Sequence, residues 1–100
     1  MLHPKFIISE NGELRLGRVR LHEDLVRKGE KDCYGGGYYE IDIINNVILL
    51  YDESGDYGEP MWNVFDTIKV SKAYRGLRIV YRPEKDSQAG EIEITNFCYV

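Results

Sequence analysis

The apolar positions near the N-terminus predict a β-hairpin. Residues 6–8 and 14–21 are rich in apolar side chains, and Asn11-Gly12 between them is typical of a tight hairpin turn. Strict alternation along the second segment would place its apolar side chains on both faces. A β-bulge at Gly17 would bring them onto one face. The opposite face would then carry a basic stripe of Arg15, Arg18 and Arg20.

A second hairpin is predicted in the middle of the chain. Residues 36–43 alternate between apolar and polar side chains, Asn45-Asn46 is typical of a turn, and residues 47–51 are continuously apolar. Because 47–51 is apolar on both faces, we expect a central strand. The glycines that precede this hairpin, Gly35-Gly36-Gly37, predict either a sharp turn or a close approach by a ligand.

Two segments have the features of helices. Residues 22–29 place acidic side chains first, basic side chains last and a glycine at the end, which suits the helix dipole and a glycine stop. Residues 60–74 begin with a proline and repeat apolar side chains at helical spacing. We expect a short helix at 22–29 and the main helix at 60–74.

The remaining apolar segments complete the predicted fold. Residues 77–82 and 91–100 read as strands, separated by a polar turn. The order of elements predicts an α+β domain with a mostly antiparallel sheet of about five to six strands and two helices packed on it. Residues 1–100 are expected to form one domain with one core.

Composition and charge restrict the partners. Hydrophobic residues make up 43% of the chain and charged residues 30%, as in an ordinary soluble protein. A net charge of −4 is unfavourable for general nucleic-acid binding. We expect no membrane contact and a cytoplasmic location, because the apolar runs are short and no secretory signal is visible. Cys33 and Cys98 are expected to be reduced core thiols rather than a disulfide.

The glycine segment and a second glycine-bearing loop suggest a family. The run from Cys33 to Gly58 contains Cys-x-Gly-Gly-Gly, a predicted hairpin and then Tyr-x-x-Ser-x-x-Tyr-Gly. This run resembles the janus/ocnus family of small phosphohistidine phosphatases. About two-thirds of the chain is covered, with no match over residues 91–100. Family members are expected to work without a metal or cofactor, through a histidine, a serine hydroxyl and backbone amides around the phosphoryl group.

The resemblance implies a site on this chain. His22, in a segment similar to the family's His-x-Asp-[Ile/Leu], would be the catalytic residue, either as a general base or as a phosphoryl acceptor. The phosphate-binding residues would be Arg15, Glu23, Ser54, Gly55 and Asp56. Backbone amides of a glycine loop at a helix start suit an anion. The expected partner is a phosphorylated protein or a small phosphate-bearing ligand.

The same loop also supports a different function. Asp52, Glu53 and Asp56 would place three carboxylates beside a phosphate dianion, which is unfavourable. The alternative is therefore a non-catalytic protein-interaction domain that keeps the fold without the activity. A cation site is a weaker reading, because the loop lacks the glycine and the distal glutamate of an EF-hand. The oligomeric state does not follow from these patterns.

Overall fold

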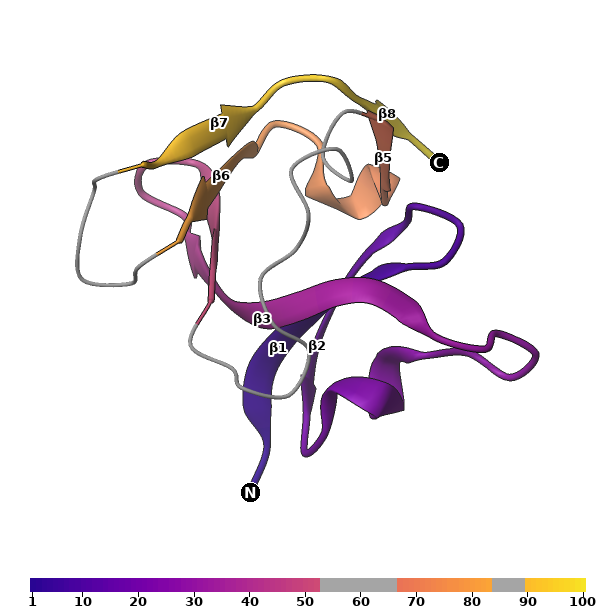
Figure 1. Cartoon of the computed structure of the whole chain (residues 1–100). Helices are drawn as coiled ribbons and strands as arrows, with labels where there is room; N and C mark the ends of the chain where they lie inside the picture. Colours follow the sequence, from indigo (N-terminus) through magenta and orange to yellow (C-terminus); the bar gives the residue numbers. More distant parts are fainter. Residues whose placement is uncertain (53–66, 84–89) are drawn as a thin grey trace.

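The computed structural model describes residues 1–52, 67–83 and 90–100. In chain order the strands are β1 (His3–Ser9), β2 (Leu14–Val19), β3 (Cys33–Asp42), β4 (Val47–Tyr51), β5 (Ile68–Val70), β6 (Arg78–Arg82), β7 (Ile92–Ile94) and β8 (Phe97–Tyr99). Among the described residues, the 3-10 helices η1 (His22–Leu25) and η3 (Lys72–Tyr74) lie between strands. Figure 1 shows how these elements are arranged.

Six strands form one mixed sheet in the order β2-β1-β3-β4-β6-β7. Neighbouring strands are antiparallel except β4 and β6, which are parallel. The central position of β4 confirms the prediction from its continuous apolar sequence. Both predicted hairpins are present, and their turns contain Gly12 and Asn46 with positive φ angles of 82° and 55°. The sheet ends at β2 on one side and β7 on the other.

The second sheet, a parallel pair of β5 and β8, lies across the concave side of the first (Figure 1). Lys69 N–H donates to the Gly12 carbonyl at 2.9 Å and links β5 to the first hairpin. The core fills the space between the sheets. Its buried members are Phe6, Ile8, Leu14, Ile48, Leu50, Ile68, Val70, Ile79, Tyr81 and Ile94.

The prediction of two helices packed on the sheet is wrong. The described residues contain no helix of seven residues or more. At residues 22–29 the helix is one turn long: Asp24 Oδ2 accepts from Leu21 N–H at 3.1 Å at its start, and Val26 N–H donates to the Glu23 carbonyl at 3.0 Å at its end. Glu30 N–H then donates to the Arg27 carbonyl at 3.0 Å, and Gly29 has a φ of 93°. The glycine therefore forms a turn in an eight-residue segment that is too short to hold a helix by itself.

The predicted main helix at 60–74 lies partly outside the described residues, and its described end is not an α-helix. Ile68 and Val70 are buried while Lys69 is exposed, which is the two-residue period of a strand. Ser71 then caps η3, its Oγ accepting from Ala73 N–H at 3.2 Å. The β-branched side chains of β5 complete the core in an extended conformation, and this tertiary packing overrides the helical spacing.

Two further details of the predicted strands are wrong. The β1–β2 register runs without interruption from His3↔Val19 to Ile8↔Leu14, so Gly17 forms no bulge and the arginines form no stripe. The last predicted strand is two strands, β7 in the large sheet and β8 in the small one. A register shift does occur near the β2 end of the sheet, but it lies between Ile8 and Ser9, where β1 pairs with β3.

Candidate functional site

The three consecutive glycines lie inside β3, not in a loop before it. All three are buried, and Gly36 pairs with Ile7 of β1. A Cβ on Gly36 would lie 2.8 Å from the Phe6 carbonyl oxygen and 3.0 Å from His22 Cδ2. A Cβ on Gly37 would overlap the carbonyl oxygen of Tyr51. These two glycines therefore allow close approach, and the groups that approach are protein backbone and the His22 ring.

His22 is packed against these glycines. Its side chain is 1% exposed, and its Nε2 lies 2.8 Å from the Gly37 carbonyl oxygen. The ring also makes an edge contact with Tyr38, which in turn stacks on Tyr51. The position of η1 is thus fixed to the outer face of β3 by a buried imidazole. The burial and contacts of His22 are those of a packing residue. Its catalytic role stays a prediction.

Arg15 has carboxylate partners within the chain. Its guanidinium donates to both carboxylate oxygens of Glu30, at 2.5 and 2.8 Å, and to the Leu25 carbonyl at 3.0 Å. Glu13 lies 3.4 Å away. The Arg15 side chain is 9% exposed. The hydrogen bond from Arg15 is the main reason that the pKa of Glu30 is lowered to about 2. Arg15 therefore holds the segment after η1 onto β2.

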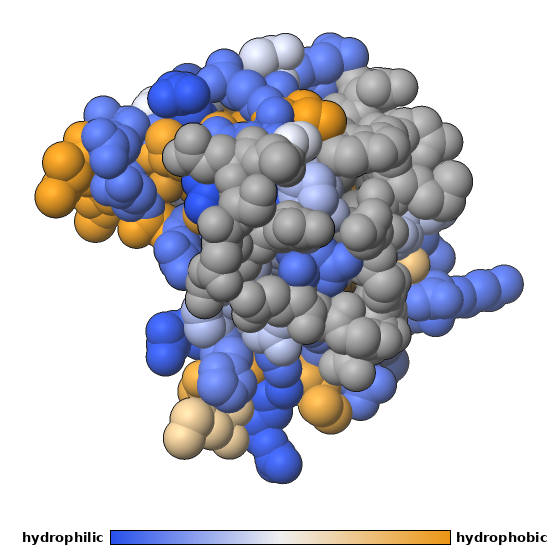
Figure 2. All heavy atoms as spheres, turned by 60° about the vertical axis from the view of Figure 1, so that its left-hand side comes forward, coloured by the Kyte–Doolittle hydropathy of each residue, from blue (hydrophilic) through white to orange (hydrophobic). Residues whose placement is uncertain are grey.

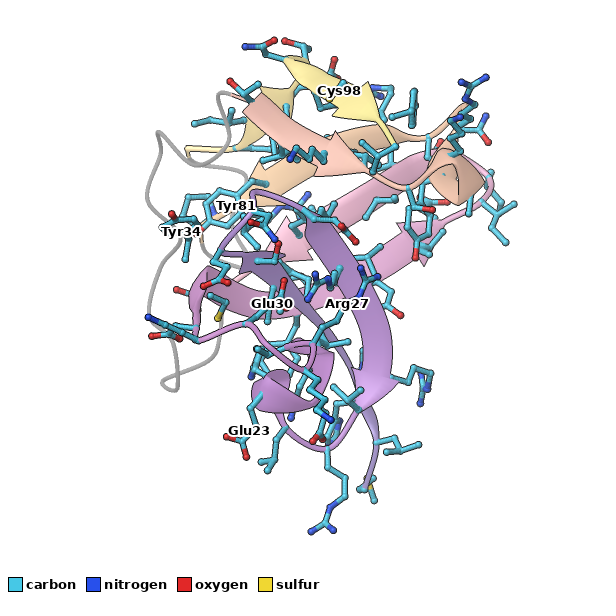
Figure 3. All side chains as sticks on the ribbon, turned by 90° about the vertical axis from the view of Figure 1, so that its right-hand side faces the viewer. Glu23, Arg27, Glu30, Tyr34, Tyr81 and Cys98 are labelled. Carbon is cyan, nitrogen blue, oxygen red and sulfur yellow. The ribbon has the colours of Figure 1, made fainter. Side chains whose placement is uncertain are left out.

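The other predicted site residues are separate from this pair. Glu23 is exposed on η1 and points away from Arg27 and Glu30 (Figure 3). Ser54, Gly55 and Asp56 lie outside the described residues, so their distance from His22 is untested. Cys33 is half-buried, and burial raises the pKa of its thiol. Cys98 is exposed on β8, contrary to the expected core thiol (Figure 3).

The first hairpin turn determines which backbone groups of β2 face the sheet edge. Ser9 N–H donates to the Glu13 carbonyl at 2.9 Å, which makes these two residues a hydrogen-bonded pair. Such pairs alternate along an antiparallel ladder, so the backbone groups of Leu16 and Arg18 point away from β1. In the described ranges, no backbone hydrogen bond outside the strand ladders uses either residue. Within the part of the chain that the structure describes, this stretch of β2 is an open edge.

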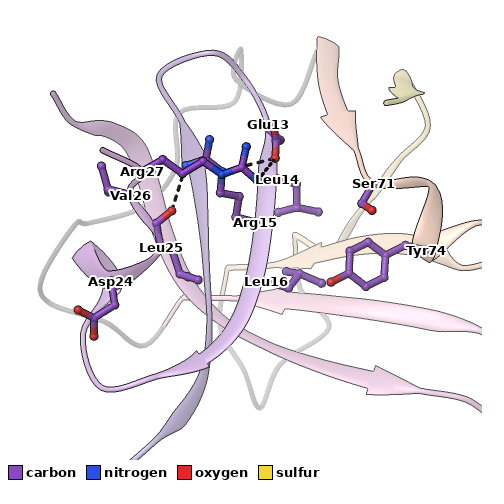
Figure 4. A pocket seen from close by; sticks show the side chains of 10 residues that line it. All are labelled: Glu13, Leu14, Arg15, Leu16, Asp24, Leu25, Val26, Arg27, Ser71 and Tyr74. Atoms are coloured by element: carbon purple, nitrogen blue, oxygen red, sulfur yellow. Dashed lines mark hydrogen bonds and ion pairs between the residues drawn. The ribbon is translucent and has the colours of Figure 1, made fainter. Parts of the chain in front are cut away.

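A groove of about 330 Å³ lies along this edge (Figure 4). One wall comes from the end of η1 and the residues that follow it, where Leu25 packs so closely that a Cβ on Gly17 would lie 2.9 Å from its Cδ2. The other wall comes from Ser71 and Tyr74 at η3. The lining residues are Glu13, Leu14, Arg15, Leu16, Asp24, Leu25, Val26, Arg27, Ser71 and Tyr74. Sequence reasoning missed this groove because the assumed bulge removed the regular edge of β2.

Apolar side chains are also exposed at the β3–β4 turn. Ile43 is 79% exposed and Ile44 is 92% exposed. Figure 2 shows apolar atoms that project from one side of the molecule. A second groove, of about 380 Å³, lies over the outer face of β4 and β6. Its charged lining includes Arg78 and Arg82, which are paired with glutamates of the β7 region.

The comparisons with known proteins assign no family. No protein-family model matches the chain. No curated protein and no solved structure matches it either. The resemblance to the janus family therefore stays a prediction. Among the described residues, no helix is long and apolar enough to cross a membrane, and no group of three histidine, cysteine or acidic side chains could hold a metal ion.

Proposed function

We propose that this chain is a non-catalytic protein-interaction domain that binds an extended segment of its partner at the edge of β2. The observation that carries the proposal is the groove along this edge. An extended peptide placed there would pair with the backbone groups of Leu16 and Arg18. Its side chains would alternate between the Leu25–Val26 wall and the Tyr74 wall. The pairing would extend the six-stranded sheet by one strand.

The open part of β2 is short, and the residues that precede it are held by buried contacts. Lys69 covers the start of the strand through its bond to Gly12, so the free edge begins after it. Leu14 is 2% exposed and Arg15 8%, which holds the strand in place before a partner arrives. A rigid edge loses little conformational entropy on binding. We expect weak to moderate affinity, because few backbone hydrogen bonds can form.

The test is a titration of the ¹⁵N-labelled protein with three peptides, each of eight residues, that alternate valine with glutamate, serine or lysine. At least one peptide should shift the amide resonances of Leu16 and Arg18 more than those of β4. The same peptide with N-methyl groups on the residues that pair with β2 should lose binding, whereas methylation of the alternate residues should not. If none of the three peptides shifts these resonances, the proposed function is wrong.

The phosphatase activity implied by the janus resemblance is the competing proposal. It predicts release of phosphate from a phosphohistidine-bearing protein, with loss of release in His22→Ala and Ser54→Ala. The packing of His22 and the carboxylate partners of Arg15 favour the interaction domain instead. Turnover by the native protein that both variants abolish would replace our proposal. A cytoplasmic location belongs to the proposal as well, since both cysteines are free thiols.

A further inference from the structure

On the basis of the proposed function, we infer that the partner's segment is selected by one apolar side chain, which lies opposite Leu16 and packs against Leu16 and Tyr74. The residues on either side of it contribute backbone pairing, and the groove does not select their charge. The partner is therefore an extended segment with an apolar anchor residue.

The pleat of β2 divides the groove into two walls. Leu14 belongs to the buried core and Leu16 packs against it, so these side chains point to the core face of the strand. Arg15 and Gly17 point to the other face, where Arg15 donates to the Leu25 carbonyl and a Cβ on Gly17 would lie 2.9 Å from Leu25 Cδ2. An added strand therefore turns alternate side chains toward a core-side wall and an η1-side wall.

The core-side wall offers an apolar contact. Tyr74 packs against the same core as Leu16, and both half-buried residues line the groove (Figure 4). Burial raises the pKa of the Tyr74 phenol, as expected in apolar surroundings. A residue directly opposite Leu16 on an added strand has its side chain on the same face as Leu16. An apolar side chain there would bury surface against both Leu16 and Tyr74.

The η1-side wall carries charges that already have partners. Arg15 binds Glu30 and lies 3.4 Å from Glu13, and Arg27 lies 3.3 Å from Glu13. The carboxylate of Asp24 accepts a backbone N–H at the start of η1. Because neither sign of charge is in excess, a partner side chain that turns toward this wall gains little from a charge of either sign.

The position opposite Leu16 differs from its neighbours along the core-side wall. Before it, the bridge between Glu13 and Lys69 joins β2 to β5 and occupies the start of the edge. After it, Arg18 is exposed and is not among the described lining residues. Within the described chain, an added strand thus meets open apolar cover at one position of this wall.

A second copy of this chain is a poorer occupant of the edge. In an antiparallel pair, Leu16 would lie opposite Leu16 or Arg18 of the copy, because these residues have outward backbone groups. The first register brings Arg18 opposite Leu14, where β5 already bridges the hairpin. The second register places a guanidinium against the apolar wall. A partner segment with an apolar anchor has neither disadvantage.

The experiment measures the fluorescence anisotropy of labelled peptides with the full chain. An alanine–serine peptide should bind about tenfold more weakly than the valine–serine peptide, because each alanine lacks the two methyl groups that the anchor position buries. The valine–glutamate and valine–lysine peptides should bind within about threefold of the valine–serine peptide in about 150 mM NaCl, where exposed charges are screened.

The variants locate the anchor position. Tyr74→Ala should reduce the preference for valine over alanine to about threefold, whereas Tyr74→Phe should keep it, because the ring makes the contact. The matched control is Tyr99→Ala, since Tyr99 is also half-buried against the core but is not among the described lining residues. It should keep the full preference. A ratio of two affinities on one folded variant does not depend on the stability that the variant loses.

The outcomes separate the anchor from the proposed function. Equal binding of the valine–serine and alanine–serine peptides would overturn the anchor while the interaction domain stands. A difference above about tenfold between the glutamate and lysine peptides would overturn the absence of charge selection. An unchanged preference in Tyr74→Ala, or an equal loss in Tyr99→Ala, would overturn the role of Tyr74. Binding by none of the peptides overturns the proposed function itself. Sedimentation that shows a dimer through β2 would overturn the choice of occupant.

Discussion

Replacement of Gly36 by alanine is the sharpest test of what the glycine run in β3 does. The added Cβ would lie 2.8 Å from the Phe6 carbonyl oxygen, 3.0 Å from His22 Cδ2 and 3.3 Å from Ile7 Cγ2. An ordinary contact begins near 3.4 Å. The Phe6 oxygen cannot move away alone, because β1 is held between β2 and β3. Either β3 or β1 must therefore shift.

Overpacking of this kind costs about 2 to 3 kcal/mol. With a urea dependence of about 1.5 kcal/mol per M, typical of a chain of this length, the unfolding midpoint should fall by about 1.3 to 2 M. The matched control is Gly76→Ala. Gly76 has a φ of 88° and no atom within 4 Å of an added Cβ, so only backbone strain of about 1 kcal/mol is expected.

The assay is urea unfolding followed by Trp62 fluorescence and by circular dichroism for both variants. A midpoint for Gly36→Ala that equals the native value, or that falls less than that of Gly76→Ala, would refute the packing argument. Such a result would favour a glycine that is kept for a ligand. Our reasoning also predicts that the double variant His22→Ala/Gly36→Ala loses less stability than the sum of the two single losses, since His22→Ala removes one of the three close neighbours of the added Cβ.

Three other outcomes follow from the structure. The pKa of Glu30 is lowered to about 2 against about 4.5 in the unfolded chain, so its stabilising contribution is present above pH 4.5 and is lost as the pH falls toward 2. Glu30→Gln should therefore flatten the dependence of the urea midpoint on pH between about 5 and 2.5; an unchanged slope would contradict the pairing with Arg15. Ile44→Ser should change the free energy of unfolding by less than about 0.5 kcal/mol, because the side chain is 92% exposed, and a larger loss by urea unfolding would contradict the exposed turn. Ellman's reagent should react with exposed Cys98 faster than with half-buried Cys33, so Cys98→Ser should remove the fast phase. A fast phase retained in Cys98→Ser would show that Cys33 is the more reactive thiol.

The sequence by itself determined the two N-terminal hairpins and the central strand. Asn11-Gly12 and Asn45-Asn46 each mark a turn through local backbone preference, and the apolar run of β4 requires cover on both faces wherever it lies. These features depend on neighbours a few residues apart. They therefore survive in any tertiary arrangement.

The tertiary structure alone decided the segments that were predicted as helices. The helical spacing near Ile68 and Val70 also fits a strand, and only the pairing of β5 with β8 and with the first hairpin selects the extended form. Residues 22–29 have the charge order of a helix, but the bond between Arg15 and Glu30 holds them as one turn and a loop. These contacts join residues that are distant in the sequence, so no local pattern reveals them.

The same distinction applies to the candidate site. The glycines of β3, His22 and Arg15 stand out in the sequence because their residue types suit phosphate chemistry. Their partners are what decide their role: Phe6 and Tyr51 backbone for the glycines, the Gly37 carbonyl for His22, and Glu30 for Arg15. The groove at β2 arises in the opposite way, because residues of ordinary type become a binding edge only when η1 and η3 are placed on either side of it.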